Sequence, residues 1–289
     1  MIIVKLMGGL GNQLFEYAFG KTIALKHGVQ LKVDVSGIDG HANHTDRAFD
    51  LAKLDKDILI ASAAELKPYQ KGKLRKGIDL AGMSVGITGI HTYVRELHFY
   101  YSSLAAKAPA DCYLDGYWQS ERYFAEQREA LLASLTSDVR LSERSLELAK
   151  RMENENSVSI HIRRGDYLNE VNKTIYAYCD QAYYLSAMEL IGSRMKDPVF
   201  YLFSDDSNVV LQHSSAQVVR VDHNIGRDSY QDLFLMSKCK HNIIANSSFS
   251  WWGAWLNDNK NKIVIAPQKW FKDSSKKTKD LIPENWIKQ

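Results

Sequence analysis

The segment "SVSIHIRRGDYL" at residues 157–168 begins as an apolar run and ends in two arginines and an aspartate. A buried strand is predicted for its first half, so that His161 and Arg163 share one face and the two isoleucines share the other. Arg164 is left to pair with Asp166 or with another carboxylate. Because a guanidinium can hold a phosphate through two parallel hydrogen bonds, Arg163 is predicted to bind an anion. A structural cluster of ion pairs at a domain edge is the alternative.

A second anion site is predicted in "ANSSFSWWGAWL" at residues 245–256, where small polar residues precede an expected helix. These residues are Asn246, Ser247 and Ser248. Their hydroxyls and backbone N–H groups would lie at the positive end of the helix dipole, which attracts anions. The three tryptophans are expected to pack in the core, and Phe249 or Trp252 is the candidate wall of a nucleotide pocket.

A glycine turn between a strand and a helix is predicted in "MGGLGNQLF" at residues 7–15. The pattern is close to a dinucleotide-binding fingerprint, but Leu14 occupies the position of the third glycine, which argues against a nicotinamide or flavin cofactor. Gly9 and Gly11 still allow a ligand to approach the backbone closely. Asn12 then offers an amide at a helix start, suited to an anion or a sugar hydroxyl. A tight turn with Asn12 as helix cap is the alternative.

Paired carboxylates end the next predicted strand in "YLFSDDS" at residues 201–207. In extended chain Asp205 and Asp206 project to opposite faces, which disfavours a metal ion held by both. One is expected to cap the following helix, and the other to accept hydrogen bonds from a ribose or a base edge.

The composition narrows the function class. The 289 residues include 37 basic and 34 acidic side chains, a net charge of +3, which does not favour nucleic-acid binding. Three cysteines stand far apart, at positions 112, 179 and 239, which argues against a disulfide framework or a zinc cluster and fits a reducing cytosol. No metal site is expected.

A cytoplasmic protein is expected, because glycines interrupt the first apolar run and no apolar run reaches about 18 residues. The lysine-rich stretch at residues 260–279 is interpreted as a solvated surface. Loose attraction to an anionic membrane is the alternative, so that contact with the inner face of the membrane is peripheral at most.

The elements that position these residues alternate between strand and helix in the second half of the chain. Strands are predicted at residues 157–162, 199–203, 217–221, 241–245 and 262–265, and helices at 180–195, 206–213, 228–238 and 248–257. Such alternation predicts a parallel sheet covered on both faces, with ligands beyond the carboxyl ends of its strands.

The first half begins in the same way and then becomes less regular. Strands are predicted at residues 2–6, 30–33 and 112–114, helices at 12–27, 120–135 and 142–154, and loops with short elements at 45–54 and 67–89. The acidic, amide-rich "MENENS" at residues 152–157 is the best boundary. The sequence therefore predicts an α/β protein with two facing domains, residues 1–153 and 154–289.

The ordered motifs "GGLGNQLF", "HIRRGDY", "FSDD" and "NSSFSWWGAWL", with "DGYWQSERYF" at residues 115–124, resemble those of the α-1,2-fucosyltransferases of glycosyltransferase family 11. The resemblance spans nearly the whole chain. It implies a GT-B-like fold of two Rossmann-type domains with parallel sheets, and GDP-fucose as donor substrate without a further cofactor. It also implies a galactose-containing glycan or lipid-linked oligosaccharide as acceptor, inversion without a metal, and, for bacterial members, work on O-antigen or related glycans.

The resemblance assigns roles to matched positions. Arg163 would hold the β-phosphate and Asn12 would lie near fucose, and both are expected to act in catalysis. The full donor-binding set is Gly9, Gly11, Asn12, His161, Arg163, Asp205, Asp206, Asn246, Ser247, Ser248 and Phe249. Asp232 is a further candidate for guanine or ribose, and Glu16 stands where many relatives have glutamine.

The first domain is assigned to the acceptor and the second to the donor. Acceptor-side candidates are Asp115, Trp118, Gln119 and Glu121, and the general base is left open among Asp34, Asp115 and Glu121. A transition state that needs little help from a base is a further alternative. A GT-B transferase with another nucleotide sugar and a non-catalytic carbohydrate-binding protein remain the rival functions.

Overall fold

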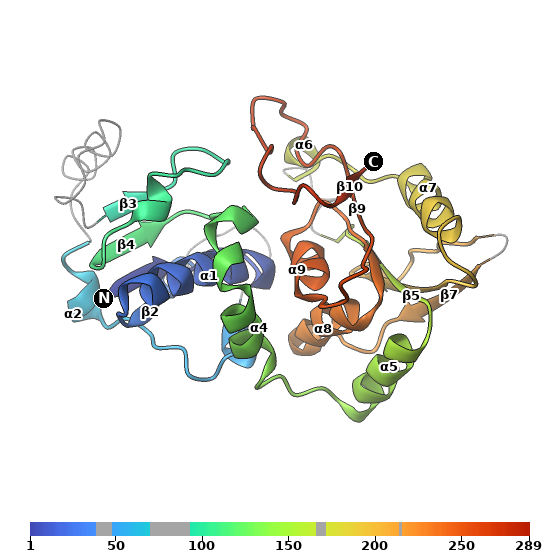
Figure 1. The fold of residues 1–289 in the computed structure, drawn as a ribbon, viewed down its shortest axis with the longest axis horizontal. Coiled ribbons are helices and arrows are strands. Elements are labelled where there is room, and N and C mark those ends of the chain that lie inside the picture. The colour runs from blue at the N-terminus through green and yellow to red at the C-terminus, as the bar shows by residue number, and fades with distance from the viewer. Residues whose placement is uncertain (39–47, 70–92, 166–171, 214–215) are drawn as a thin grey trace. The chain divides into compact units, whose positions relative to one another are not determined.

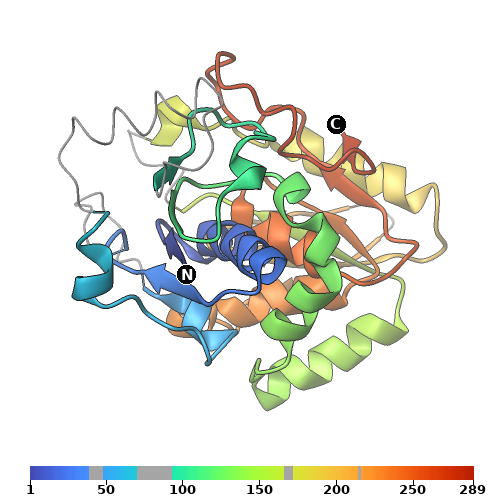
Figure 2. The same ribbon diagram turned by 60° about the vertical axis from the view of Figure 1, so that its left-hand side comes forward.

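The computed structural model describes residues 1–38, 48–69, 93–165, 172–213 and 216–289. They form two compact units, one of residues 1–139 with 277–283 and one of 140–276 with 284–289 (Figures 1 and 2). The division falls between residues 139 and 140, whereas the sequence places it between 153 and 154. The difference is helix α5 (Glu143–Asn154), which packs against α8 (Tyr230–Lys238) and so belongs to the second unit.

The first unit is built on a four-stranded parallel sheet in the order β2-β1-β4-β3. Its strands are β1 (Ile2–Lys5), β2 (Leu31–Asp34), β3 (Tyr93–Arg95) and β4 (Cys112–Asp115). Helix α1 (Leu10–His27) approaches this sheet closely at Gly20, where an added Cβ would lie 2.9 Å from Leu31 Cδ1. Gly20 therefore allows the close helix–strand contact that Leu14 does not.

Short helices complete the first unit. They are η1 (Asp50–Lys53), α2 (Ala63–Leu66), η2 (Ala105–Lys107), η3 (Glu121–Tyr123), η4 (Ala125–Gln127) and α4 (Arg128–Thr136). The continuous helix predicted at residues 120–135 is wrong, because Phe124 leaves the helical conformation with φ of −145°. Its ring is fully buried and lies 5.9 Å from that of Phe15. Tertiary packing thus breaks a segment whose local pattern is helical.

The second unit contains a six-stranded parallel sheet in the order β10-β9-β8-β5-β6-β7. Its strands are β5 (Ser157–Ile162), β6 (Val199–Ser204), β7 (Gln217–Val221), β8 (His241–Ile243), β9 (Val264–Ala266) and β10 (Ile287–Lys288). Its helices are α5, α6 (Asn172–Ile175), α7 (Gln181–Gly192), η6 (Gly226–Asp228), α8 and α9 (Ser248–Leu256). The predicted parallel α/β architecture is confirmed.

The helix predicted at residues 206–213 is wrong, because this segment is a turn followed by irregular chain. Arg220 of β7 holds it, donating from Nη2 to the Asp206 carbonyl at 2.8 Å and from Nη1 to the Val209 carbonyl at 2.6 Å. Val209 and Leu211 are buried in the core. Long-range contacts therefore decide the conformation of this connection.

Helices cover both faces of the larger sheet, as Figure 1 shows for α7 and for α8 with α9. Ile160 and Ile162 of β5 pack with α7 on one face, and Tyr201 and Phe203 of β6 pack with α5 and α8 on the other. The tryptophans of α9 are all buried, as predicted, and the rings of Trp251 and Trp286 lie 5.4 Å apart.

Candidate functional site

Arg163 lies directly after β5 and is oriented by Asp205, which directly follows β6. Its Nη1 lies 2.9 Å from Asp205 Oδ2, and both side chains are about one quarter exposed, at 23% and 24%. Asp205 also accepts the N–H of Arg164 at 2.8 Å, and an added Cβ on Gly165 would lie 2.6 Å from its Oδ2. Burial raises the pKa of Asp205, but Arg163 and the backbone donors outweigh this and lower it. Asp205 therefore stays ionised and fixes Arg163 at the strand end.

Arg164 turns to other partners. Its Nη2 donates to the hydroxyl of Tyr178 at 2.8 Å, and its Nη1 lies 4.0 Å from Asp206 Oδ2. The alternative partner Asp166 lies outside the described residues. The two adjacent arginines thus diverge onto different carboxylates.

His161 lies in β5, two residues before Arg163, and is buried, with 4% of its surface exposed. Its ring centroid lies 5.7 Å from that of Phe249 in α9. Burial lowers the pKa of His161, and Arg163 lowers it further against the opposing effect of Asp205, so the ring is neutral at physiological pH. Among the described residues no hydrogen-bond partner meets its Nδ1. The predicted placement of His161 opposite the two isoleucines is confirmed.

Helix α9 starts at Ser248, shortly after β8 ends at Ile243, and β8 lies beside β5 in the sheet. Ser247 is its N-cap residue, with extended backbone and no side-chain capping bond. The side chain of Asn246, in contrast, is already hydrogen-bonded, because its Nδ2 donates to the carbonyls of Ala177 at 2.5 Å and Trp270 at 2.9 Å. Asn246 therefore ties two loops together, while Ser247 and the first turn from Ser248 keep donors at the helix start.

Two further carboxylates of this unit, Asp206 and Asp232, are candidates for nucleotide contact. Asp206 accepts the N–H of Asn208 through Oδ1 at 2.9 Å, a local turn contact. Asp232 stands in the first turn of α8, and its Oδ1 accepts from Asn224 Nδ2 at 2.8 Å. Burial raises the pKa of Asp232 to about 7, against the lowering effect of the Asn224 bond. Asp232 thus titrates near neutrality.

The glycine turn of the first unit fixes Asn12. Gly8 has φ of +69°, and an added Cβ would lie 2.5 Å from Asn12 Nδ2. Gly9 is the N-cap of α1, so Asn12 is an internal residue of the first turn rather than the cap. Its Oδ1 accepts from Gln119 Nε2 at 2.9 Å, which joins two residues of the candidate set. The turn therefore presents the Asn12 amide in a defined orientation.

Glu16 lies one helical turn after Asn12 and is fully buried. Its Oε2 accepts the N–H of Met7 at 2.8 Å, and its Oε1 has no partner among the described residues. Burial raises the pKa of Glu16 well above its ordinary value, although the Met7 bond opposes it. Its surroundings therefore favour the protonated form, which has the charge of an amide.

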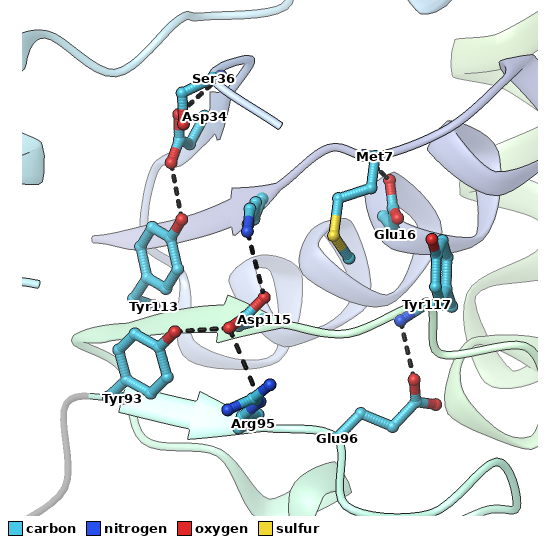
Figure 3. A network of polar contacts seen from close by, with 11 residues as sticks. Met7, Glu16, Asp34, Ser36, Tyr93, Arg95, Glu96, Tyr113, Asp115 and Tyr117 are labelled. Atoms are coloured by element: carbon cyan, nitrogen blue, oxygen red, sulfur yellow. Dashed lines mark hydrogen bonds and ion pairs between the residues drawn. The ribbon is translucent and has the colours of Figure 1, made fainter. Parts of the chain in front are cut away.

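The carboxyl edge of the smaller sheet carries two tyrosine–carboxylate pairs (Figure 3). The Tyr113 hydroxyl donates to Asp34 Oδ2 at 2.6 Å, and the Tyr93 hydroxyl donates to Asp115 Oδ2 at 2.5 Å. Asp115 also faces Lys5 Nζ at 3.7 Å and Arg95 Nε at 4.0 Å. Two of the three predicted base candidates, Asp34 and Asp115, thus already have strong partners.

Trp118 is fully buried, with its ring 4.7 Å from that of Phe19, so it does not present its side chain to a ligand. Its backbone has φ of +54°, which is strained for a tryptophan. Glu121 starts η3 and is half-buried. Of the acceptor-side candidates, the structure brings Gln119 to Asn12 and leaves Trp118 in the core.

Glu96 is a residue that the sequence analysis did not select. It follows β3, and its Oε2 and Oε1 accept the N–H groups of Tyr117 at 2.8 Å and Trp118 at 3.1 Å. The sequence signal was short, because only three strand residues, Tyr93 to Arg95, precede it, and no strand was predicted there. Its partners come from a segment 21 positions further along the chain.

Within the described ranges, no group of three or more histidine, cysteine, aspartate or glutamate side chains could hold a metal ion. In the same ranges no helix is long and apolar enough to cross a membrane.

The sequence matches the family described as Glycosyl transferase family 11 over residues 1–289. It is 32% identical to an alpha-1,2-colitosyltransferase of Escherichia coli, over 100% of this chain and 98% of that protein. It is 30% identical to the Escherichia coli O-antigen biosynthesis glycosyltransferase WbnK, over 98% of each. Similarity to rat galactoside alpha-(1,2)-fucosyltransferase 1 is 32% identity over 34% of this chain and 27% of that protein. The chain belongs to glycosyltransferase family 11.

Solved structures agree with the fold. NodZ alpha-1,6-fucosyltransferase, soaked with GDP-fucose, matches with a TM-score of 0.50 at 14% identity, over 88% of this chain and 91% of that one. A variant of Arabidopsis thaliana FUT1 in complex with GDP matches with a TM-score of 0.52 at 12% identity, over 92% of this chain and 70% of that one. Both are GT-B-type fucosyltransferases, so the predicted fold class is confirmed.

Proposed function

We propose that the protein transfers L-fucose from GDP-fucose to the 2-hydroxyl of a galactose-type acceptor, with inversion and without a metal ion. One observation carries the donor part: Arg163, His161 and the start of α9 lie at the carboxyl ends of adjacent strands in one sheet. This edge is where parallel α/β sheets bind their ligands. The family membership supports glycosyl transfer, and the relatives' printed activities support a deoxysugar donor.

The donor site would stabilise the departing diphosphate. As the bond between the anomeric carbon and the phosphate oxygen breaks, negative charge grows on GDP. Arg163 and the first N–H groups of α9 are donors suited to that charge, each charge-assisted hydrogen bond contributing about 1.5–3 kcal/mol. Such preorganised donors are commonly the largest catalytic contribution. The unpartnered Nδ1 of His161 fits a ligand group at the same place.

The guanine base is assigned to Asp232 in this proposal. A carboxylate can accept from N1–H and the exocyclic amine of guanine, and the Asn224 bond engages only Oδ1 of Asp232. Asp205 and Asp206 fit this role less well, because Arg163 and the 206–208 turn occupy them. Asp205 then serves the donor by orienting Arg163.

The first unit is assigned to the acceptor, with Asn12 and Gln119 as its hydrogen-bonding pair. That Asn12 also lies near fucose stays a prediction. The acceptor is proposed to be a galactose-containing glycan or lipid-linked oligosaccharide of the O-antigen kind, in keeping with relatives such as WbnK. A lipid-linked acceptor is consistent with a cytoplasmic enzyme in peripheral contact with the membrane, since Lys269, Lys272 and Lys276 are exposed.

One experiment tests this function. The purified protein is incubated with GDP-fucose and a panel of galactosides, with and without EDTA, and the new linkage is identified by NMR. The expected product is an α-1,2-linked fucoside formed at the same rate in EDTA. A product with another linkage, or a rate abolished by EDTA and restored by a divalent ion, would contradict the proposal.

A second donor has a specific observation in its favour, namely the whole-length identity of 32% to an alpha-1,2-colitosyltransferase. Colitose is L-fucose without its 3-hydroxyl group. A site that hydrogen-bonds a substrate hydroxyl rejects the analogue without it by about 10⁴–10⁵. Competition between GDP-fucose and GDP-colitose at equal concentration therefore decides between the two, and a strong preference for GDP-colitose would replace fucose in the proposal.

A further inference from the structure

The carboxyl edge of the smaller sheet brings together three acidic side chains from three elements (Figure 3). Glu16 comes from α1, Glu96 follows β3, and Asp115 ends β4. Glu96 and Asp115 both act electrostatically on Glu16. Their surroundings differ, because Glu16 is fully buried while Asp115 is bonded to Tyr93 and faces two cations. Acidic groups whose environments separate their protonation states are typical of acid–base sites.

The chain is shaped around the carboxylate of Glu96. Both of its oxygens accept backbone N–H groups, from Tyr117 at 2.8 Å and Trp118 at 3.1 Å. Trp118 adopts φ of +54° to make this contact, and such conformations cost about 1–3 kcal/mol. Gly116 is required beside it, because an added Cβ would collide with Cβ of Glu96. Backbone strain that the surrounding structure maintains around one carboxylate indicates that the position of this carboxylate is fixed.

The two hydrogen bonds leave lone pairs of the Glu96 carboxylate available to accept a proton. An ionised carboxylate offers about four lone-pair sites, and the two N–H groups use two of them. Glu96 is half-buried rather than enclosed. The other base candidates are more occupied, since Asp34 accepts from Tyr113 and Ser36, and Asp115 from Tyr93.

The pKa of Glu96 is suited to a group that accepts a proton. Burial, together with the charge of Asp115, raises its pKa to about 7 against the lowering effect of the two N–H donors. A general base works best when its pKa is near the operating pH. The titratable and charged groups around it are Glu16, Asp115 and Tyr123, with Lys5 and Arg95 beside Asp115.

We propose that Glu96 is the general base that takes the proton from the attacking hydroxyl of the acceptor. The inference rests on the proposed transferase function. As the acceptor oxygen bonds to the anomeric carbon, its proton passes to a Glu96 oxygen. The bond from that carbon to the diphosphate breaks, and GDP leaves with the electron pair. Glu96 then gives the proton to water. Asp115 is a positioning residue, because its charge helps to keep the pKa of Glu96 high enough to accept the proton.

The test measures transfer from GDP-fucose to lactose between pH 5 and 9, with calorimetric binding of GDP as a second measurement. In the unaltered enzyme kcat/KM rises with pH up to about 7 and then levels off. Glu96→Gln and Glu96→Ala are expected to lose about 10²–10⁴-fold in kcat and to lose that rise. GDP affinity stays within twofold, because Arg163 and the start of α9, the proposed diphosphate donors, lie in the other unit. Formate restores part of the activity of Glu96→Ala only.

Glu65→Gln is the matched control, since Glu65 belongs to the same unit and its capping box with Ser62 accepts glutamine. It is expected to keep the wild-type profile. A Glu96→Ala enzyme that binds GDP, ignores formate and keeps the wild-type pH profile in its residual activity would show that Glu96 only shapes the loop. Absence of transfer by the unaltered enzyme refutes the proposed function and this base together, whereas normal transfer with such variants refutes the base alone.

Discussion

In both units parallel strands end at one edge, and the side chains gathered there differ in charge. At the edge of the larger sheet lie Arg163, a neutral buried His161 and the start of α9, with Asp205 bound to the arginine. At the edge of the smaller sheet lie carboxyl groups and tyrosines, with Glu96 held by backbone amides. One architecture can thus present donors for an anion in one unit and acceptors for protons in the other.

In the proposed function, the two edges neutralise different charges. A leaving diphosphate needs positive charge and N–H groups that are already oriented, and these come from a guanidinium and a helix start. A hydroxyl that becomes a nucleophile needs a proton acceptor, and burial prepares one by raising a carboxyl pKa. The predictions below test whether the two edges divide the work in this way.

The largest effect is expected for Arg163→Ala, which removes a donor to the leaving group. Loss of one such donor typically lowers kcat by about 10²–10³. Arg163→Lys should fall in between, because a point charge replaces the two-pronged contact. Steady-state kinetics and calorimetric GDP binding give the measurement. Arg194→Ala, which changes an exposed arginine of the same unit, is the control and should behave as wild type. Near-normal turnover by Arg163→Ala would show that the edge of the larger sheet does not stabilise the leaving group.

The next effect concerns stability and comes from the other unit. Glu16 is buried and protonated in the folded chain, while in the unfolded chain it ionises above its ordinary pKa of 4.5. Folding stability therefore falls as pH rises above that value, by at most about 1.4 kcal/mol per pH unit from this group. Glu16→Gln removes the dependence, so it should equal wild type near pH 4 and exceed it at pH 8.

Thermal unfolding measured from pH 4 to 8 tests this difference in stability between Glu16→Gln and wild type. Glu65→Gln provides the opposite sign, because the Lys32 bond lowers the pKa of Glu65 from 4.5 to about 2. Its stabilising contribution is therefore lost as pH falls below about 4.5 and is constant at higher pH. A stability difference between Glu16→Gln and wild type that is constant with pH would show that Glu16 is ionised when folded.

A smaller effect is expected at the turn that carries Asn12. Gly8→Ala places a side chain at φ of +69° and 2.5 Å from Asn12 Nδ2. The strain of a left-handed alanine is about 1–2 kcal/mol, and the amide of Asn12 must shift. Urea unfolding measures the loss, and acceptor KM reports the shift. Gly192→Ala in α7 meets nothing within 4 Å and serves as control; equal losses in both variants would contradict the argument.

The smallest effect is expected for Asp205→Asn, because Asp205 acts through Arg163 rather than on the substrate. The variant keeps an oxygen for the backbone N–H groups but loses the charge that fixes the guanidinium. We expect kcat to fall roughly tenfold, equivalent to about 1.4 kcal/mol, with GDP affinity changed less. Asp180→Asn, an exchange of two good helix caps, is the matched control. A loss as large as that of Arg163→Ala would mean that Asp205 contacts the substrate itself.

Several features could be predicted from the sequence because they depend on residues close together in the chain. The period-two pattern of residues 157–162 placed His161 and the two isoleucines on opposite faces, as found. Alternating strands and helices predicted parallel sheets with covered faces, as found. The small polar residues before the tryptophans predicted a helix that starts at Ser248.

Other features depended on contacts between distant segments and could not be predicted. Asn246 was selected for the donor, but loops at positions 177 and 270 occupy its amide. The segment at 206–213 has helical character locally, yet Arg220 holds it as a turn. Glu96 escaped selection because the N–H groups that orient it lie more than twenty positions away.

By itself the sequence determined the alternation of elements, the face on which each strand residue lies and the chemical types available at each strand end, because backbone geometry fixes these over a few residues. Only the tertiary structure decided which carboxylate meets Arg163, which amides are already occupied and which acid is buried enough to hold its proton. Those outcomes depend on desolvation and on partners brought together by folding, and neither is encoded within a short stretch of chain.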